Sequence, residues 1–198
     1  ARTLEVHERY GSAVVAEVVD HLIAYAAHLT RLGFAAMPDG TYSGSYALEP
    51  DGIEADRELV VRCRITIDGD RCHVDFTGTD RQSRGAVNSS YSQSLSAVVY
   101  ALRCFLDPTI PMNEGFYDVI GATLPAGTLV NPRHPAAANL RMGVVHGILD
   151  AVDEALAPVF PDLVVAAGSV AATATISGAV PGSAWTMLDA HFGVGGAR

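Results

Sequence analysis

A change of hydrophobic period near residue 40 limits the folds that this chain can adopt. Before it, apolar and small residues recur every three or four positions, as on one stripe of an α-helix. That stripe comprises Gly11, Val15, Val18, Leu22, Tyr25, Leu29 and Leu32. After it, "LVVRCRITIDGDRCHVDF" (59–76) alternates apolar and polar residues, as strands with one buried face do. The two periods together predict an α+β fold with a mixed or antiparallel sheet.

The alternating segment reads as a β-hairpin with a definite register. We place Asp68-Gly69 at the centre of a two-residue type I′ turn, so that Ile67 faces Asp70. One face then pairs apolar residues on both strands: Ile65 with Cys72, Cys63 with Val74 and Val61 with Phe76. The other face pairs Arg64 with His73 and Arg62 with Asp75. Since pattern and turn agree, we expect an Arg62–Asp75 contact across the strands.

Three main helices are expected. The first lies within 1–37, with a break at Gly11–Ser12, Ser12 as N-cap and Gly33 at the C-cap. The second is "SLSAVVYALRCFL" (94–106), which Asp107-Pro108 ends. The third is 139–157, and its apolar stripe is expected to be buried. This stripe comprises Leu140, Val144, Ile148, Val152 and Leu156.

The remaining segments read as strands and loops without a clean linker. We expect strands in 40–49 and 117–124, a loop at 49–56, and short strands after Pro161 separated by Pro-Gly turns. The chain is therefore interpreted as one domain portion over 1–198, with a helical segment 1–37 and a mixed α+β unit 38–198.

Composition excludes several classes of function. The 198 residues are 49% apolar and 18% charged, and the net charge of −9 without a basic block argues against nucleic-acid binding. No uninterrupted apolar run suggests a membrane span, and no signal peptide opens the sequence. The odd count of three cysteines argues against a disulfide framework and favours a cytoplasmic setting. Because the sequence starts at Ala1 and stops at "GVGGAR", we expect a piece of a longer protein.

One polar constellation follows the hairpin. Asp75 and Thr77 end its second strand, Gly78 frees the backbone, and Asn88 follows ten residues later. A carboxylate at a strand end with amide donors nearby can form the wall of a polar pocket. An ordinary cross-strand pair on a solvated face explains the same residues. The spacing alone favours the solvated face.

Two stiff turns supply further polar side chains. "PMNEGFYD" presents Asn113, and "NPRHP" holds Asn131 and Arg133 between two prolines. Turn chemistry explains both equally well. The histidines suggest no metal site, because His21 and His28 are two helical turns apart, roughly 10 Å along the axis.

Read as one ordered string, these motifs resemble the hydantoinase B family. The resemblance is carried by "PDGTY" (38–42), "IDGDRCHVDFTGTDRQSRGAVN" (67–88), "YALRCFLDPTIPMNEG" (100–115) and "LPAGTLVNPRHPAA" (124–137). It runs from the first helix through the third. Family members include the hydantoinase B-type polypeptides of N-methylhydantoinases and relatives in 5-oxoprolinase, ketone carboxylases and caprolactamase. The resemblance implies that this chain is part of a larger hydantoinase B fold.

The resemblance also implies a chemistry. Family members open cyclic amides with ATP, together with a hydantoinase A-type subunit that binds ATP and Mg²⁺. Asp75 is then the candidate catalytic residue, and Thr77, Asn88, Asn113, Asn131 and Arg133 are candidate substrate contacts. The family's metal ligands belong to a part N-terminal to this chain, so no metal or other cofactor is assigned to it. The expected partners are the A-type subunit and the rest of the B-type polypeptide in a hetero-oligomer, without nucleic acid or membrane.

Three functions stay open at this point. The chain can be part of an ATP-dependent amidohydrolase that is inactive alone. It can belong to an ATP-dependent ketone carboxylase, or be a non-catalytic assembly module derived from the family. A stand-alone hydrolase is disfavoured, because no nucleophile–base pair is evident in the sequence.

Overall fold

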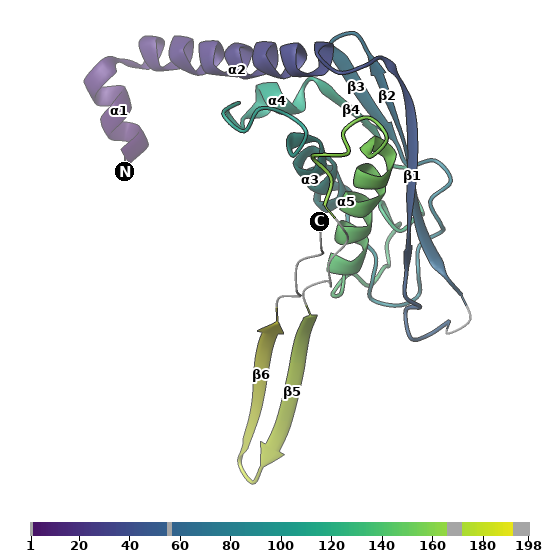
Figure 1. The fold of residues 1–198 in the computed structure, drawn as a ribbon. Helices are drawn as coiled ribbons and strands as arrows, with labels where there is room; N and C mark the ends of the chain where they lie inside the picture. The colour runs from purple at the N-terminus through teal and green to yellow at the C-terminus, as the bar shows by residue number, and fades with distance from the viewer. Residues whose placement is uncertain (1, 55–56, 166–171, 192–198) are drawn as a thin grey trace.

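The fold is a mixed α/β arrangement built on a four-stranded sheet. The computed structural model describes residues 2–54, 57–165 and 172–191. The elements run in the order α1 (Arg2–Tyr10), α2 (Ser12–Ala35), β1 (Gly40–Leu48), β2 (Leu59–Asp68), β3 (Arg71–Asp75), α3 (Tyr91–Arg103), α4 (Glu114–Tyr117), β4 (Ile120–Thr123), α5 (Met142–Leu156), β5 (Ala172–Val180) and β6 (Ser183–His191) (Figure 1). The sheet order is β1-β2-β3-β4, with only the β3–β4 pair parallel, and β5–β6 forms a separate hairpin. The α+β prediction is confirmed.

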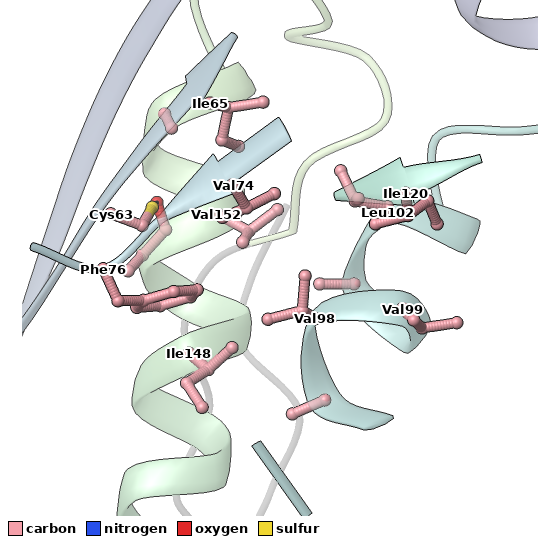
Figure 2. Packing of buried hydrophobic residues seen from close by; sticks show 14 of the residues in the cluster. Cys63, Ile65, Val74, Phe76, Val98, Val99, Leu102, Ile120, Ile148 and Val152 are labelled. Atoms are coloured by element: carbon pink, nitrogen blue, oxygen red, sulfur yellow. The ribbon is translucent and has the colours of Figure 1, made fainter. Parts of the chain in front are cut away.

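The hydrophobic core lies between the sheet and helices α3 and α5. Figure 2 shows Cys63, Val74 and Phe76 from the hairpin pointing toward Ile148 and Val152 of α5. The buried residues of β2 and β3 are those that the alternating pattern placed on the apolar face. The alternating pattern therefore identified correctly which face of the hairpin is buried.

The hairpin register differs from the predicted one. Arg64, not Arg62, lies opposite Asp75, and the turn is centred on Gly69 and Asp70. Of the two central turn residues only Gly69 has a positive φ, 57°, so glycine takes the first central position, as type II′ turns require. The predicted Arg62–Asp75 contact is therefore wrong. Moving the turn by one residue shifts each partner by two, which leaves the faces unchanged.

Helix α2 exposes most of the apolar stripe that the sequence spacing predicted. Its buried residues are Ala26, Thr30 and Phe34, on another side of the helix. The N-cap is Gly11, with φ 81°, and Ser12 is the first helical residue. Gly33 is not a C-cap, because the helix continues to Ala35. A Cβ at Gly33 would lie 2.6 Å from Leu106 Cδ2, so Gly33 allows close packing against that side chain.

Most of the other predicted elements are present, but their first and last residues differ from the prediction. Helix α3 begins three residues earlier than predicted, and Leu140 lies before α5 and is exposed. Helix α4 replaces part of a predicted loop and strand. Its Gly115 brings α4 against α2, since a Cβ there would lie 2.0 Å from the Ile23 carbonyl oxygen. The strands expected after Pro161 are confirmed as β5 and β6; residues 166–171 lie outside the described ranges.

Helix α2 is long and apolar enough to cross a membrane by length and composition alone. The sequence expectation concerned uninterrupted apolar runs, which this criterion does not require. A core helix of a soluble protein or a signal sequence meets the same criterion, so the finding is weak evidence for a membrane. Charged residues interrupt the helix at Glu17, Asp20 and Arg31.

Candidate functional site

A polar hollow of about 350 Å³ opens beside β1 and β2. Hydroxyl, guanidinium and carboxylate groups surround it, a mixture suited to a small polar ligand. The lining residues are Ser43, Gly44, Ser45, Arg62, Cys63, Arg64, Thr77 and Glu154. Glu154 reaches the site from α5 and accepts hydrogen bonds from the backbone N–H and the hydroxyl of Ser45. The site thus combines polar residues of two neighbouring strands with one carboxylate from the helix behind them.

Asp75 lies next to this hollow, opposite Arg64 in the register. Its Oδ1 accepts a hydrogen bond from the Thr77 backbone N–H at 2.8 Å. The Thr77 hydroxyl lowers the pKa of Asp75 most, and the charges of Arg64 and His73 lower it further. Asp75 is therefore ionised near neutral pH and is a weak proton acceptor. Its geometry fits the orientation of Thr77 and Arg64 better than proton abstraction.

The backbone after Asp75 continues alongside β2 through side-chain hydrogen bonds. Gly78 has φ 97°, which turns the chain out of the strand. The Thr79 hydroxyl accepts from the Arg62 N–H at 3.0 Å and donates to the Arg62 carbonyl at 2.9 Å. Asp80 Oδ2 accepts from the Val60 N–H at 3.0 Å. The polar run after β3 is therefore structural in part, since it satisfies backbone groups that a longer strand would satisfy.

The two arginines of the hollow differ in their freedom. The Arg62 guanidinium is fixed by Asp80 Oδ1 at 2.9 Å and by the Gly78 carbonyl at 2.8 Å. The Arg64 guanidinium makes no hydrogen bond or ion pair within the described ranges. Five N–H donors on Arg64 are therefore available to a ligand in the hollow. Sequence reasoning missed Arg64, because its predicted partner was His73.

The Asn88 amide is fully buried and holds a turn together. Its Oδ1 accepts from the Ser83 N–H at 2.8 Å. Its Nδ2 donates to the carbonyls of Ser83, Gly85 and Ala137. All of these partners belong to the protein, so in this conformation the amide supports the loop. Its predicted contact with substrate stays a prediction.

The other predicted contacts lie on separate turns. Asn113 caps α4 through Gly115 and donates to the Leu22 carbonyl of α2. Asn131 donates to the Leu124 carbonyl at 2.7 Å, and the backbone of Arg133 bonds with the Gln82 side chain. None of these residues lines the hollow. The structure thus brings Asp75 and Thr77 together and places Asn113, Asn131 and Arg133 on other turns, where their substrate contacts stay predictions.

A second network joins the loop after β1 to the loop after β3. Asp51 accepts hydrogen bonds from Ile53, Glu54, the Ser83 hydroxyl and Gly85. The Ser83 hydrogen bond is the main cause of a strongly lowered pKa of the Asp51 carboxyl. The Asp51-Gly52 pair signals a local turn, but nothing in the sequence indicates its contact with Ser83.

Acidic side chains on α5 line a neighbouring hollow of about 330 Å³. Burial raises the pKa of Asp153 to about 6, with the charge of Asp150 adding to it. Burial also raises the pKa of Asp150, and the charge of His146 opposes that change. Within the described ranges, no group of three or more histidine, cysteine or acidic residues is placed to hold a metal ion. These residues therefore do not fit a divalent ion.

Comparison with known proteins places the chain in one family. The family model described as Hydantoinase B/oxoprolinase matches residues 1–198. The B component of a putative D-/L-hydantoinase from Pseudomonas sp. (strain NS671) is 28% identical over the whole chain and 35% of its own length. The beta component of the caprolactamase of Pseudomonas jessenii is 32% identical over 90% of the chain and 31% of its own length.

Solved structures agree with this assignment. A crystal structure of ATP-dependent caprolactamase from Pseudomonas jessenii matches 93% of the chain and 32% of its own chain, with a TM-score of 0.80 and 29% identity. Nucleotide-free acetone carboxylase matches 84% of the chain with a TM-score of 0.72 at 19% identity, a likeness of fold. The chain spans about one third of the length of the curated relatives it matches. From this evidence, the chain belongs to the hydantoinase B/oxoprolinase family.

Proposed function

We propose that this chain is part of an ATP-dependent enzyme that opens cyclic amides together with a hydantoinase A-type partner. The observation that carries the proposal is the match to ATP-dependent caprolactamase, with a TM-score of 0.80 over 93% of the chain. Relatives named as single components of a hydantoinase and of a caprolactamase support a heteromeric assembly. The three free cysteines fit the proposed cytoplasmic location.

The amide carbonyl is the group that such an enzyme must activate. Transfer of the ATP γ-phosphoryl group to the carbonyl oxygen activates the carbon, and water then adds to it. The ring C–N bond breaks as a proton passes to the nitrogen, which leaves an acyl phosphate. A second water releases phosphate and the ring-opened acid. The sequence contains no P-loop, so we assign nucleotide binding to the partner. Because the described residues do not fit a divalent ion, no step of this chain is assigned to one.

The hollow beside β1 and β2 offers complementary groups for an amide. The Arg64 guanidinium can donate to the phosphorylated carbonyl oxygen, beside the negative charge of the transferred phosphoryl group. The Glu154 carboxylate can accept the amide N–H. Asp75 stays ionised, accepts from the Thr77 N–H and faces Arg64 across the strands, so it acts as a positioning residue.

The test is reconstitution with an A-type partner and the remaining B-type polypeptide. We expect ATP-dependent ring opening of a panel of lactams, hydantoins and 5-oxoproline, followed by chromatography of the ring-opened acid. The Arg64→Ala variant should lose roughly 10²–10³-fold in kcat, as expected for removal of one charge-stabilising donor. The Asp75→Asn variant should lose activity and shift the pH profile. Arg71→Ala, on the same hairpin with a side chain 77% exposed, is the matched control.

A non-catalytic assembly role is the second candidate. It is favoured by the internal hydrogen bonds of Asn88, Asn113 and Asn131, which are structural. In that case the chain would still form a complex with the partner, while turnover of the complex would not change in Arg64→Ala or Asp75→Asn. Bicarbonate-dependent consumption of a ketone in the same assembly would instead indicate a carboxylase.

A further inference from the structure

Strand β1 ends the four-stranded sheet, and one of its edges has no partner strand in the described part of the chain. It pairs with β2 alone, without a bulge, over all nine residues from Gly40 to Leu48. Edge strands of soluble proteins usually carry charged residues, proline or bulges that prevent another strand from adding. The sequence of β1, "GTYSGSYAL", has none of these. Its edge is therefore suited to β-strand addition.

The backbone groups at this edge can be identified from the hydrogen bonds of β1. Ser45 donates its N–H to the Glu154 carboxylate, so the backbone groups of Ser45 point away from β2. In an antiparallel pair, every second residue shares this direction. The backbone groups of three further residues, which make no hydrogen bond within the described ranges, therefore also face the open edge: Thr41, Ser43 and Ala47. An extended strand presents donors and acceptors at the same two-residue interval.

A hollow lies along the same edge. It is the acidic hollow of about 330 Å³, which Ser45 and Tyr46 of β1 line together with acidic residues of α5. Helix α5 lies beside β1 (Figure 1), since a Cβ at Gly44 would meet its backbone. A strand added to β1 places every second side chain on the face of the sheet that carries Tyr46. One of these side chains therefore faces the hollow.

The charge in the hollow specifies that side chain. Asp150 and Asp153 are both half-buried, and neither carboxylate makes a hydrogen bond or ion pair within the described ranges. Burial raises the pKa of both carboxyls, so their negative charge costs stability in the chain alone. Val164 and Val165 add apolar surface beside them. A Lys or Arg side chain fits this lining, because its apolar stem covers the valines and its charged head pairs with the carboxylates.

We propose that the open edge of β1 binds an extended segment of a partner polypeptide, which adds as a fifth strand and directs one Lys or Arg side chain into the acidic hollow. A backbone carbonyl of that segment takes the place of the Glu154 carboxylate at the Ser45 N–H. Main-chain hydrogen bonds along β1 supply affinity, and the hollow supplies selectivity for a basic residue. The proposal does not depend on the proposed function.

The test is binding of a synthetic strand to the chain. The probe is a fluorescein-labelled peptide of alternating threonine and valine with lysine at its central position, on the same face as the valines. Fluorescence polarisation should show saturable binding. Replacing lysine by norleucine should raise the Kd about tenfold, the loss of one partly buried ion pair. The same peptide with N-methyl groups on the amides that face β1 should not bind, because it lacks the ladder donors.

Two variants of the chain separate the charge from the backbone. Asp153→Asn should weaken binding of the lysine peptide about tenfold without weakening the norleucine peptide, whereas Glu8→Gln on α1 should change neither. Ser43→Pro removes an N–H that β2 does not use, so the sheet should be retained while the Kd rises at least tenfold. Ser43→Ala keeps this N–H and should bind like the unsubstituted chain. Circular dichroism checks that each variant folds.

Hydrogen exchange locates the peptide without any substitution. Binding should slow amide exchange in β1 of the unsubstituted chain, even if Ser43→Pro does not fold. Absence of binding, equal binding of the N-methylated peptide, or full binding by folded Ser43→Pro would overturn the proposal. A norleucine peptide that binds as tightly as the lysine peptide would overturn it too. So would a dimer of the chain that Ser43→Pro dissociates, since a second copy would then occupy the edge.

Discussion

Helices α5 and α2 carry the same kind of sequence signal but lie in different surroundings. Val144, Ile148, Val152 and Leu156 of α5 are all fully buried against the sheet. The corresponding stripe of α2 is about half exposed at Leu22 and Tyr25. Periodicity thus identifies a helix and its apolar side. Whether the chain itself covers that side depends on tertiary contacts, which a local pattern does not encode.

The largest difference between the two stripes is expected in stability. Ile148→Ala leaves a cavity in the core and should lower the free energy of unfolding by about 2–5 kcal/mol. Leu22→Ala removes a side chain that is 49% exposed and should change it by less than about 0.5 kcal/mol. Urea unfolding followed by circular dichroism, at concentrations where the chain is monomeric, measures both. Equal losses at the two positions would show that α2 is covered in the monomer.

The sequence predicted which face of each hairpin strand is buried better than it predicted which residues pair across the strands. The buried faces of the hairpin were correct because alternation has a period of two, and a turn moved by one residue preserves it. The identity of the pairs depends on the conformation at Gly69, which the Asp68-Gly69 pattern did not determine. Arg64 therefore replaced Arg62 opposite Asp75.

The candidate site shows the same limit. Asp75 and Thr77 were found because they are close in sequence and share a strand end. Glu154 was not found, because it reaches Ser45 from a helix over a hundred residues later. The structural bonds of Asn88 to Ala137 were equally hidden, since only the folded chain brings these two segments together.

Two glycines allow close packing at a helix, Gly44 of β1 against α5 and Gly33 within α2. A Cβ at Gly44 of β1 would lie 2.0 Å from the Ala151 carbonyl oxygen and 2.7 Å from the Ala155 nitrogen of α5. Neither backbone atom can move without shifting the helix, so Gly44→Ala should cost about 1–3 kcal/mol of stability. A Cβ at Gly33 of α2 meets only the end of the Leu106 side chain.

Gly33→Ala is therefore the matched control for Gly44→Ala. The Leu106 side chain can rotate away, and replacing glycine by alanine inside a helix is worth about 0.5–1 kcal/mol. We expect a net change near zero in thermal and urea unfolding. A large loss at Gly33 with none at Gly44 would reverse the ranking of the two helix contacts.

The smallest expected effect concerns the polar side of α5. The pKa of Asp153 is about 6 in the folded chain, because burial and the Asp150 charge disfavour its ionised form, against an ordinary value of 3.8. A raised pKa means that the folded state binds the proton more tightly, so stability is highest below about pH 4 and falls as the pH rises to about 6. At pH 7.5 Asp153 is ionised at a cost in stability, and asparagine removes that charge. Asp153→Asn should therefore raise the free energy of unfolding at pH 7.5 by about 1 kcal/mol or less, since solvent screens this half-exposed group. The gain should shrink at pH 4.5. An Asp153→Asn gain that is equal at both pH values would mean that the substitution acts through packing.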